Sequence, residues 1–96
     1  MSSKLIVMSN GATPEQQNAV TLTIKAHGAG WWHWFGQGWL IRDPYSRGAA
    51  SWRDAIRSSV PHLHIFVVQV ATPTDWAAFG TTEHFQWVIE RWNVND

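Results

Sequence analysis

Tryptophan is the residue that most constrains this chain, because eight of its 96 residues carry an indole side chain. Each indole can bury on the order of 200 Å², and a chain of this length leaves roughly a third of its unfolded surface exposed after folding. The interior is therefore too small for all eight side chains, and we expect some of them on a surface that meets another molecule. They are Trp31, Trp32, Trp34, Trp39, Trp52, Trp76, Trp87 and Trp92.

Charge and cysteine content exclude several classes of protein. Seven Lys plus Arg balance seven Asp plus Glu, which removes the broad positive field of a protein that binds mainly through phosphates. The chain has no cysteine, so a disulfide framework and a thiolate zinc cluster are excluded. No apolar run approaches the roughly 20 residues that span a bilayer, and residues 1–4 do not begin a signal peptide. We predict one domain over residues 1–96, located in the cytoplasm, with no cofactor and no membrane contact.

The first half of the chain alternates strand and helix signals. Residues 4–8 form an apolar, β-branched run that predicts a buried strand. Thr13-Pro14-Glu15-Gln16 combines an N-cap, a proline at the first helical position and a capping-box glutamine, which predicts a helix over residues 14–27. Residues 20–26 also alternate as a strand would, but the capping box and Gly28 as a stop signal favour the helix.

The second half adds a hairpin, a helix, a strand and a last helix. Residues 31–35 and 39–42 are two short strands joined by a glycine-rich loop. Residues 51–60 have helical spacing, and residues 62–70 give the strongest strand signal in the chain. The last helix is expected from about residue 82 to residue 92. Its single apolar face would consist of Phe85, Val88, Ile89 and Trp92.

This order of elements predicts an α+β fold, the ferredoxin-like β-α-β-β-α-β sandwich with an added C-terminal helix. Right-handed crossovers place both main helices on one face of such a sheet. The other face is also apolar, since strand alternation puts Trp31, His33 and Phe35 on one side and Trp32 and Trp34 on the other. A chain's own two helices cover only one face, so we predict that a second copy covers the other and that the protein is a homodimer.

Seven segments in a fixed order, together with the C-terminal amphipathic helix, resemble a known family. They are residues 4–8, 24–28, 31–34, 39–41, 52–57, the apolar strand 62–70, and 75–79. In these segments the chain resembles small SinR-like bacterial and phage proteins, which are similar to the CRISPR-associated small subunit of the spacer-integration complex and to the VapD ribonucleases. The resemblance covers nearly the whole chain and implies a homodimer that packs sheet on sheet.

The same resemblance implies where a catalytic metal would bind. The nuclease members are expected to hold a divalent metal with an Asp at the end of the first strand, because Mg²⁺ requires hard oxygen ligands. Here Ser9, Asn10 and Gly11 occupy that position, and the next acid is Glu15. We therefore predict no catalytic residues and a non-catalytic binding protein whose partner is another protein or a small ligand. The alternatives are a metal-dependent ribonuclease or deoxyribonuclease and a nucleic-acid-binding module without cleavage.

Two groups of residues are candidates for binding a ligand or partner. Ser9, Asn10 and Gly11 could form a nest of free backbone donors beside His33, although this loop could equally serve only to turn the chain. Trp31 and Trp34, with the neighbouring indoles, could stack on bases, although aromatic strands in small sheets mostly form core and interface.

Charged and histidine side chains provide weaker candidates. Residues 42–57 contain four arginines and two aspartates, a local net charge of +2, and Arg53 and Arg57 lie on the outward side of the second helix, where most such pairs are only solvated. His62 and His64 would share one face of a strand and could chelate zinc with a third ligand. Without an assigned third ligand, we predict no metal site and ordinary hydrogen bonds for both histidines.

Overall fold

The computed structural model describes residues 2–93. Four strands form one antiparallel sheet in the order β2-β3-β1-β4, so the chain has an α+β fold compatible with the ferredoxin-like prediction. No helix among residues 2–93 combines the length and the apolar character needed to cross a membrane. The elements are β1 (Ser3–Ser9), α1 (Pro14–Ala26), β2 (Gly30–Trp32), β3 (Gly38–Asp43), α2 (Ala49–Ser59), β4 (Ile65–Val70), the 3₁₀ helix η1 (Thr82–Phe85) and the π-helical segment η2 (Val88–Trp92).

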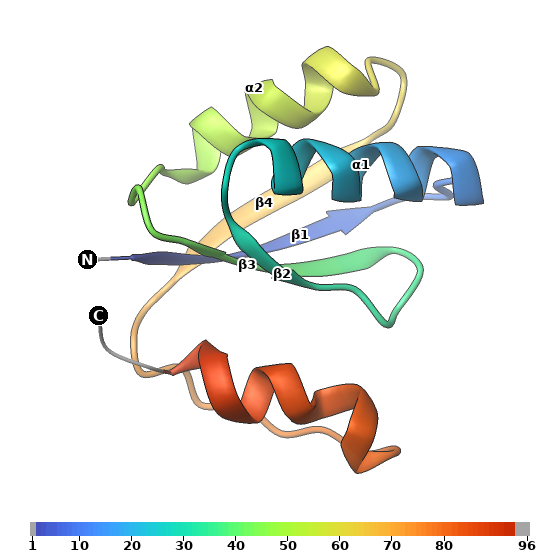
Figure 1. Ribbon diagram of the computed structural model, residues 1–96. Coiled ribbons are helices and arrows are strands. Elements are labelled where there is room, and N and C mark those ends of the chain that lie inside the picture. The colour runs from blue at the N-terminus through green and yellow to red at the C-terminus, as the bar shows by residue number, and fades with distance from the viewer. Residues whose placement is uncertain (1, 94–96) are drawn as a thin grey trace.

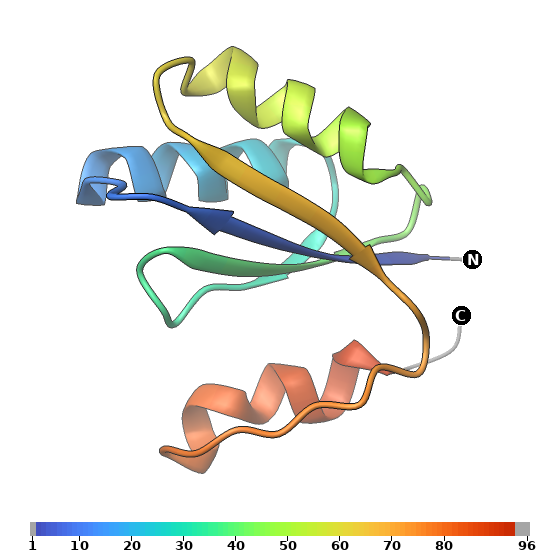
Figure 2. The same cartoon turned by 180° about the vertical axis from the view of Figure 1, so that it is seen from behind.

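Three layers are stacked in this fold. α1 and α2 lie on one face of the sheet, and the C-terminal segment with η1 and η2 lies on the other (Figures 1 and 2). We call the second face the helix-free face, because neither main helix touches it. The C-terminal segment therefore covers part of this face, while Met8 and Phe66 on it stay exposed.

The capping box at the start of α1 and the glycine after its end are confirmed. Thr13 Oγ1 accepts a hydrogen bond from the Gln16 amide at 3.1 Å, and Gln16 Oε1 accepts one from the Thr13 amide at 2.9 Å. After the helix, Gly28 has a φ of +77°, a left-handed conformation that favours glycine. The strand-like alternation before it does not form a strand, because Val20 and Ile24 are one helical turn apart and both pack into the core.

Three boundaries differ from the sequence prediction by two residues or more. β2 ends at Trp32 instead of residue 35, because the chain then enters a turn in which the Gly38 amide donates to the Phe35 carbonyl at 3.1 Å. β4 begins at Ile65 instead of residue 62, because the chain forms a turn before it in which the Leu63 amide donates to the Val60 carbonyl at 3.2 Å. α2 begins two residues earlier than predicted, at Ala49.

The main core lies between the sheet and the two helices. Alternation along β1 and β3 directs every second side chain to this side, where α1 and α2 meet it. Trp39 and Trp52 are the largest side chains buried there. The fully or almost fully buried members are Leu5, Val7, Val20, Ile24, Trp39, Ile41, Trp52 and Ile56.

A second core lies on the helix-free face. Trp32 is buried there against Phe85, Val88 and Trp92 of the C-terminal segment, and its Nε1 donates to the His84 carbonyl at 2.6 Å. The prediction that a second copy covers this face is therefore wrong for the part around Trp32, because the chain's own last helix covers it.

The last helix has the predicted extent but a different apolar face. It is helical from Thr82 to Trp92, and Phe85, Val88 and Trp92 are buried as expected. Ile89, predicted to join them, is 55% exposed. The segment opens with a 3₁₀ turn and closes with a π-helical turn, so the α-helical spacing used in the prediction does not hold along it.

Candidate functional site

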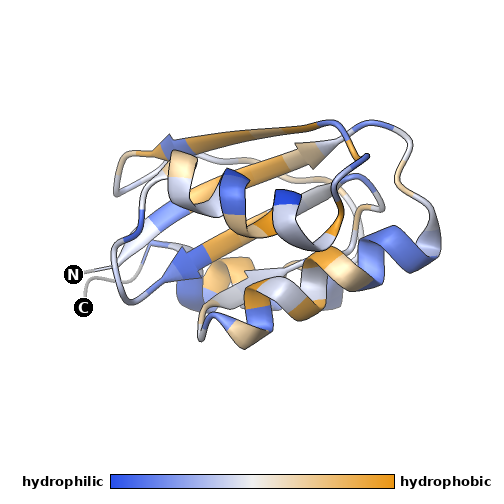
Figure 3. Ribbon diagram, turned by 90° about the horizontal axis from the view of Figure 1, so that it is seen from above, coloured by the Kyte–Doolittle hydropathy of each residue, from blue (hydrophilic) through white to orange (hydrophobic). Residues whose placement is uncertain are grey.

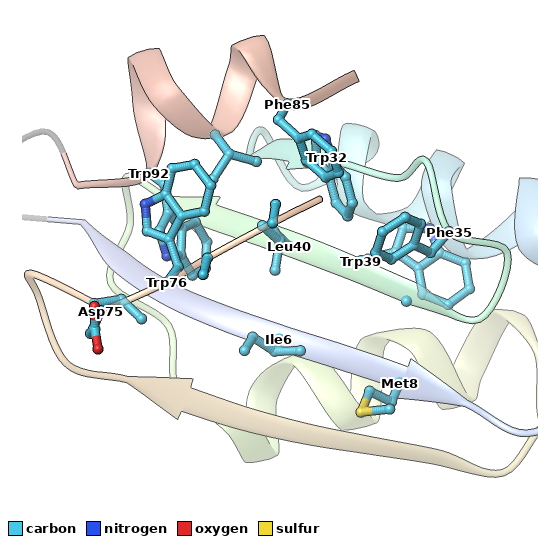
Figure 4. A pocket seen from close by; sticks show the side chains of 15 residues that line it. Ile6, Met8, Trp32, Phe35, Trp39, Leu40, Asp75, Trp76, Phe85 and Trp92 are labelled. Carbon is cyan, nitrogen blue, oxygen red and sulfur yellow. The ribbon is translucent and has the colours of Figure 1, made fainter. Parts of the chain in front are cut away.

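A pocket of about 340 Å³ lies between the helix-free face and the C-terminal segment (Figure 4). Ile6 and Leu40 form its floor on the sheet. Thr74 and Asp75 are its polar side chains, and Asp75 is the single charged one. The remaining lining side chains are apolar or aromatic, namely Met8, Trp32, Phe35, Trp39, Trp76, Ala77, Ala78, Phe85, Val88 and Trp92.

Aromatic rings form one end of this pocket. Trp32 stacks on Phe85 with ring centroids 5.7 Å apart and planes at 22°. Phe35 meets the edge of Trp32 at 5.0 Å and 83°, so it lies on the side of Trp32 and not, as predicted, on the side of Trp31. The physical reason is the early end of β2, after which strand alternation no longer applies.

The segment over the pocket is tied to the end of the last helix. Asn93 Oδ1 accepts from the Thr74 amide at 2.7 Å, and Asn93 Nδ2 donates to the Thr74 carbonyl at 2.9 Å. Trp76, which follows, is 37% exposed and lies beside Trp92 in the view of Figure 4. Residues 74–78 thus form a strap that closes one side of the pocket.

The predicted nest at the end of β1 does not have the expected free donors. The amides of Ser9 and Asn10 donate to the carbonyls of Gln37 at 2.8 Å and of His64 at 3.1 Å. Gln37 Oε1 also accepts from Ser9 Oγ at 2.6 Å. Gly11 has a φ of +68°, which matches the alternative that this loop turns the chain. No local pattern in the sequence marks Gln37, which lies in the β2–β3 hairpin and holds this loop.

His33 is engaged with its neighbours. Its ring stacks on Trp39 with centroids 4.3 Å apart and planes at 4°, and its Nδ1 lies 2.9 Å from the Gly38 carbonyl oxygen. Since Trp39 belongs to the core between sheet and helices, His33 packs on the helix side of the sheet. It is not among the residues that line the pocket.

The indoles proposed to stack on bases do not share a surface. Trp31 is half-buried against the main core. Trp39 is fully buried and donates its Nε1 to Thr21 Oγ1 at 3.0 Å, while Trp32 is buried on the opposite face. Only Trp34 is well exposed, at 56%. This arrangement does not provide the row of open aromatic faces that strand binding requires.

Both helix arginines are exposed, as predicted. Arg53 and Arg57 point outward from α2. Arg53 Nη2 lies 2.8 Å from Asp54 Oδ1, and the hydrogen bond from Arg53 lowers the pKa of the Asp54 carboxyl. Such an exposed ion pair contributes little to stability.

His62 and His64 do not lie on one face of a strand, because both precede β4. Both side chains are exposed. Within residues 2–93 no group of three or more His, Cys, Asp or Glu side chains could hold a metal ion.

A buried carboxylate forms a densely hydrogen-bonded polar site. Asp43, at the end of β3, is fully buried and accepts five hydrogen bonds: from the amides of Tyr45 and Arg47, from Arg47 Nε and Nη2, and from Trp52 Nε1. Arg47 also donates to the His27 carbonyl beyond the end of α1. The site therefore joins β3, α1 and α2.

This environment stabilises the charged form of Asp43. Burial alone would raise its pKa, but the hydrogen bonds from the Arg47 side chain, the Tyr45 amide, Trp52 and the Arg47 amide outweigh burial and lower it. The sequence offered one signal for this site, an Asp and an Arg four residues apart across a turn. Every acceptor oxygen is engaged, so the site is suited to holding the fold together.

Comparison with known proteins yields no matching family model and no curated protein or solved structure with significant similarity to the chain. The resemblance to SinR-like proteins therefore stays a prediction. The functional argument rests on the geometry of the pocket and its surroundings.

Proposed function

We propose that the protein is a non-catalytic binding protein that takes a compact apolar group of a ligand or partner into the pocket under the strap. One observation carries this proposal, the aromatic pocket of about 340 Å³. Ligand pockets in proteins are typically about 300–1,000 Å³, mostly apolar, with a few polar groups that orient the ligand. Thr74 and Asp75 at the strap are the polar groups available for that purpose.

The surplus of tryptophan supports the same proposal. Trp32, Trp76 and Trp92 all contribute to the pocket, although Trp32 is more than 40 residues away from the other two in the sequence. A rigid aromatic wall provides a large contact area at low entropic cost. We propose that the indoles beyond what the main core needs serve this site.

We further propose a ferredoxin-like fold related to the SinR-like group, without the catalytic metal of its nuclease members. The strand order β2-β3-β1-β4, with both main helices on one face, supports the fold. The non-catalytic assignment is supported by Ser9, Asn10 and Gly11 in place of the expected acid. The backbone hydrogen bonds of Ser9 and Asn10 support it as well, since they give this loop a structural role.

Binding is tested with N-phenyl-1-naphthylamine, an apolar probe whose fluorescence rises in apolar surroundings. We expect saturable binding of one probe per chain. Ile6→Phe fills the pocket from its floor and should weaken probe binding about tenfold or more, a loss of roughly 1.4 kcal/mol. Leu22→Phe, the matched control at a site on α1 that is 53% exposed, should leave binding unchanged.

Equal probe binding by both variants, or no saturable binding by the natural chain, would contradict the proposal. The nuclease alternative is tested separately, with labelled RNA and DNA in the presence and absence of Mg²⁺. Cleavage that EDTA abolishes, in material free of contaminating nuclease, would establish catalysis and reject the non-catalytic assignment.

A further inference from the structure

The outer edge of β4 lacks the usual protection of an exposed strand. β4 is the last strand in the sheet order, and within residues 2–93 no strand pairs with its far side. Its sequence, IFVVQV, contains no charge and no proline, and its six-residue register with β1 is unbroken by a bulge. Figure 3 shows it at the edge of the sheet and hydrophobic along most of its length. Natural edge strands usually carry charges, proline or bulges that prevent further pairing.

The hydrogen bond between β1 and the residue before β4 identifies which backbone groups face outward. The Asn10 amide donates to the His64 carbonyl at 3.1 Å, so His64 directs its backbone groups toward β1. Because these groups alternate along an antiparallel strand, the same holds for residues 66, 68 and 70. Ile65, Val67 and Gln69 therefore direct their N–H and C=O groups to the open edge.

Hollows lie on this edge next to exposed apolar side chains. A depression of about 230 Å³ lies between α2 and β4 beside Arg53 and Ile65, and another of about 350 Å³ lies beside Met8 and Phe66. Phe66 is 63% exposed and its neighbour Met8 is 56% exposed. Strand addition uses main-chain hydrogen bonds for affinity and such hollows for alternate side chains.

We propose that β4 pairs antiparallel with β4 of a second copy across a two-fold axis, which joins the two sheets into one. A second copy is the occupant that the charges favour. The chain has a formal net charge of +0, β4 itself is uncharged, and Arg53 beside the edge is already paired with Asp54 at 2.8 Å. A two-fold axis therefore brings no unbalanced like charges together.

The outward-facing groups also define the register. An axis through Val67 opposes Val67 to the partner's Val67, Ile65 to the partner's Gln69 and Gln69 to the partner's Ile65. All three are hydrogen-bonded pairs, and each exchanges two bonds. Moving the axis to Val68 changes the register by two residues and leaves only two such pairs within the strands. A register change of one residue would place the helices of the two copies on opposite faces of the joined sheet. In the favoured register, Phe66 lies against the partner's Val68.

This dimer differs from the sheet-on-sheet packing that the family resemblance implies. It uses the edge of the sheet, so the helix-free face and the pocket under the strap stay open in both copies. Met8 lies beside both sites, but no residue of β4 lines the pocket. Substitutions in β4 therefore separate dimer formation from ligand binding.

Sedimentation of the full chain and amide hydrogen exchange test the proposal together. We expect a dimer at micromolar concentration with slow exchange at the amides of Ile65, Val67 and Gln69. Phe66→Lys places a charge at the interface and should give a monomer in which these three amides exchange rapidly. Phe79→Lys, the matched control at a fully exposed phenylalanine, should remain a dimer.

The amides of residues 66, 68 and 70 report folding independently, because they bond to β1 in monomer and dimer alike. If Phe66→Lys loses their protection, Gln69→Pro replaces it as the test, since that change removes one outward donor at an exposed position. A monomeric natural chain, a dimer that survives the test variant, or a dimer whose outward amides exchange rapidly would each overturn the proposal.

Discussion

Replacing Asp43 with Asn should strongly destabilise the protein, because this change removes the charge of a fully buried carboxylate. The asparagine side chain would have the same shape but no charge, and its amide NH₂ would face donors where a carboxylate oxygen now accepts them. Asp43 accepts five hydrogen bonds, of which three come from the Arg47 side chain and the Trp52 indole. The substitution leaves at least one of these donors without an acceptor.

The expected loss in the free energy of unfolding follows from the burial of the Asp43 carboxylate. Removing one partner of a buried ion pair costs about 3–5 kcal/mol. The Arg47 side chain is 27% exposed while Asp43 is fully buried, so Arg47 regains part of its hydration and the loss should lie near the lower limit, about 3 kcal/mol. For a chain of this length that loss lowers Tm by roughly 12–24 °C.

Urea unfolding followed by tryptophan fluorescence measures this loss, because Trp52 is itself part of the site. The matched control is Asp54→Asn, which breaks the exposed pair with Arg53 and should leave the urea midpoint close to that of the natural chain. If Asp43→Asn costs no more than Asp54→Asn, the buried network does not join β3 to the helices as argued.

Three further predictions concern pH and the C-terminal segment. The pKa of Asp43 is lower in the folded chain than in the unfolded chain. Its contribution to stability is therefore fully present above the unfolded pKa of about 3.9 and is lost as pH falls through the folded pKa. Urea midpoints measured at decreasing pH should show this loss in the natural chain and not in Asp43→Asn. Asn93→Ala removes both hydrogen bonds to Thr74 and should accelerate proteolysis within residues 71–81. A cleavage rate equal to that of the natural chain would show that other contacts hold the strap. Trp32→Phe leaves the His84 carbonyl without its donor and should cost at least about 1 kcal/mol in the same urea assay, with an unchanged midpoint counting against this anchor.

Several elements of the fold depend only on neighbouring residues and were predictable from the amino-acid sequence. The capping box at Thr13 and Gln16 predicts the start of α1, and Gly28 predicts its end, because both signals act through hydrogen bonds or dihedral angles within one turn. The apolar run at residues 4–8 likewise predicts β1. The outward position of Arg53 follows from helical spacing alone.

The candidate site depended on contacts that no local pattern encodes. The pocket exists because the last helix returns to the helix-free face, where Trp32 bonds to His84, 52 residues away. The helix and the need for a cover on this face are both visible in the sequence, but no local pattern connects the two. The surplus of indoles pointed to a binding surface, yet only the folded chain shows that Trp76 and Trp92 share one pocket.

Burial of polar groups was likewise set by the packing of distant segments. Asp43 becomes a buried acceptor only because Trp52 and Arg47 pack around it. Ser9 and Asn10 looked open until Gln37 and His64 reached them from other parts of the chain. Whether a polar group is hydrogen-bonded depends on which distant segments pack against it. The packing of the whole hydrophobic core determines those segments, and adjacent residues do not.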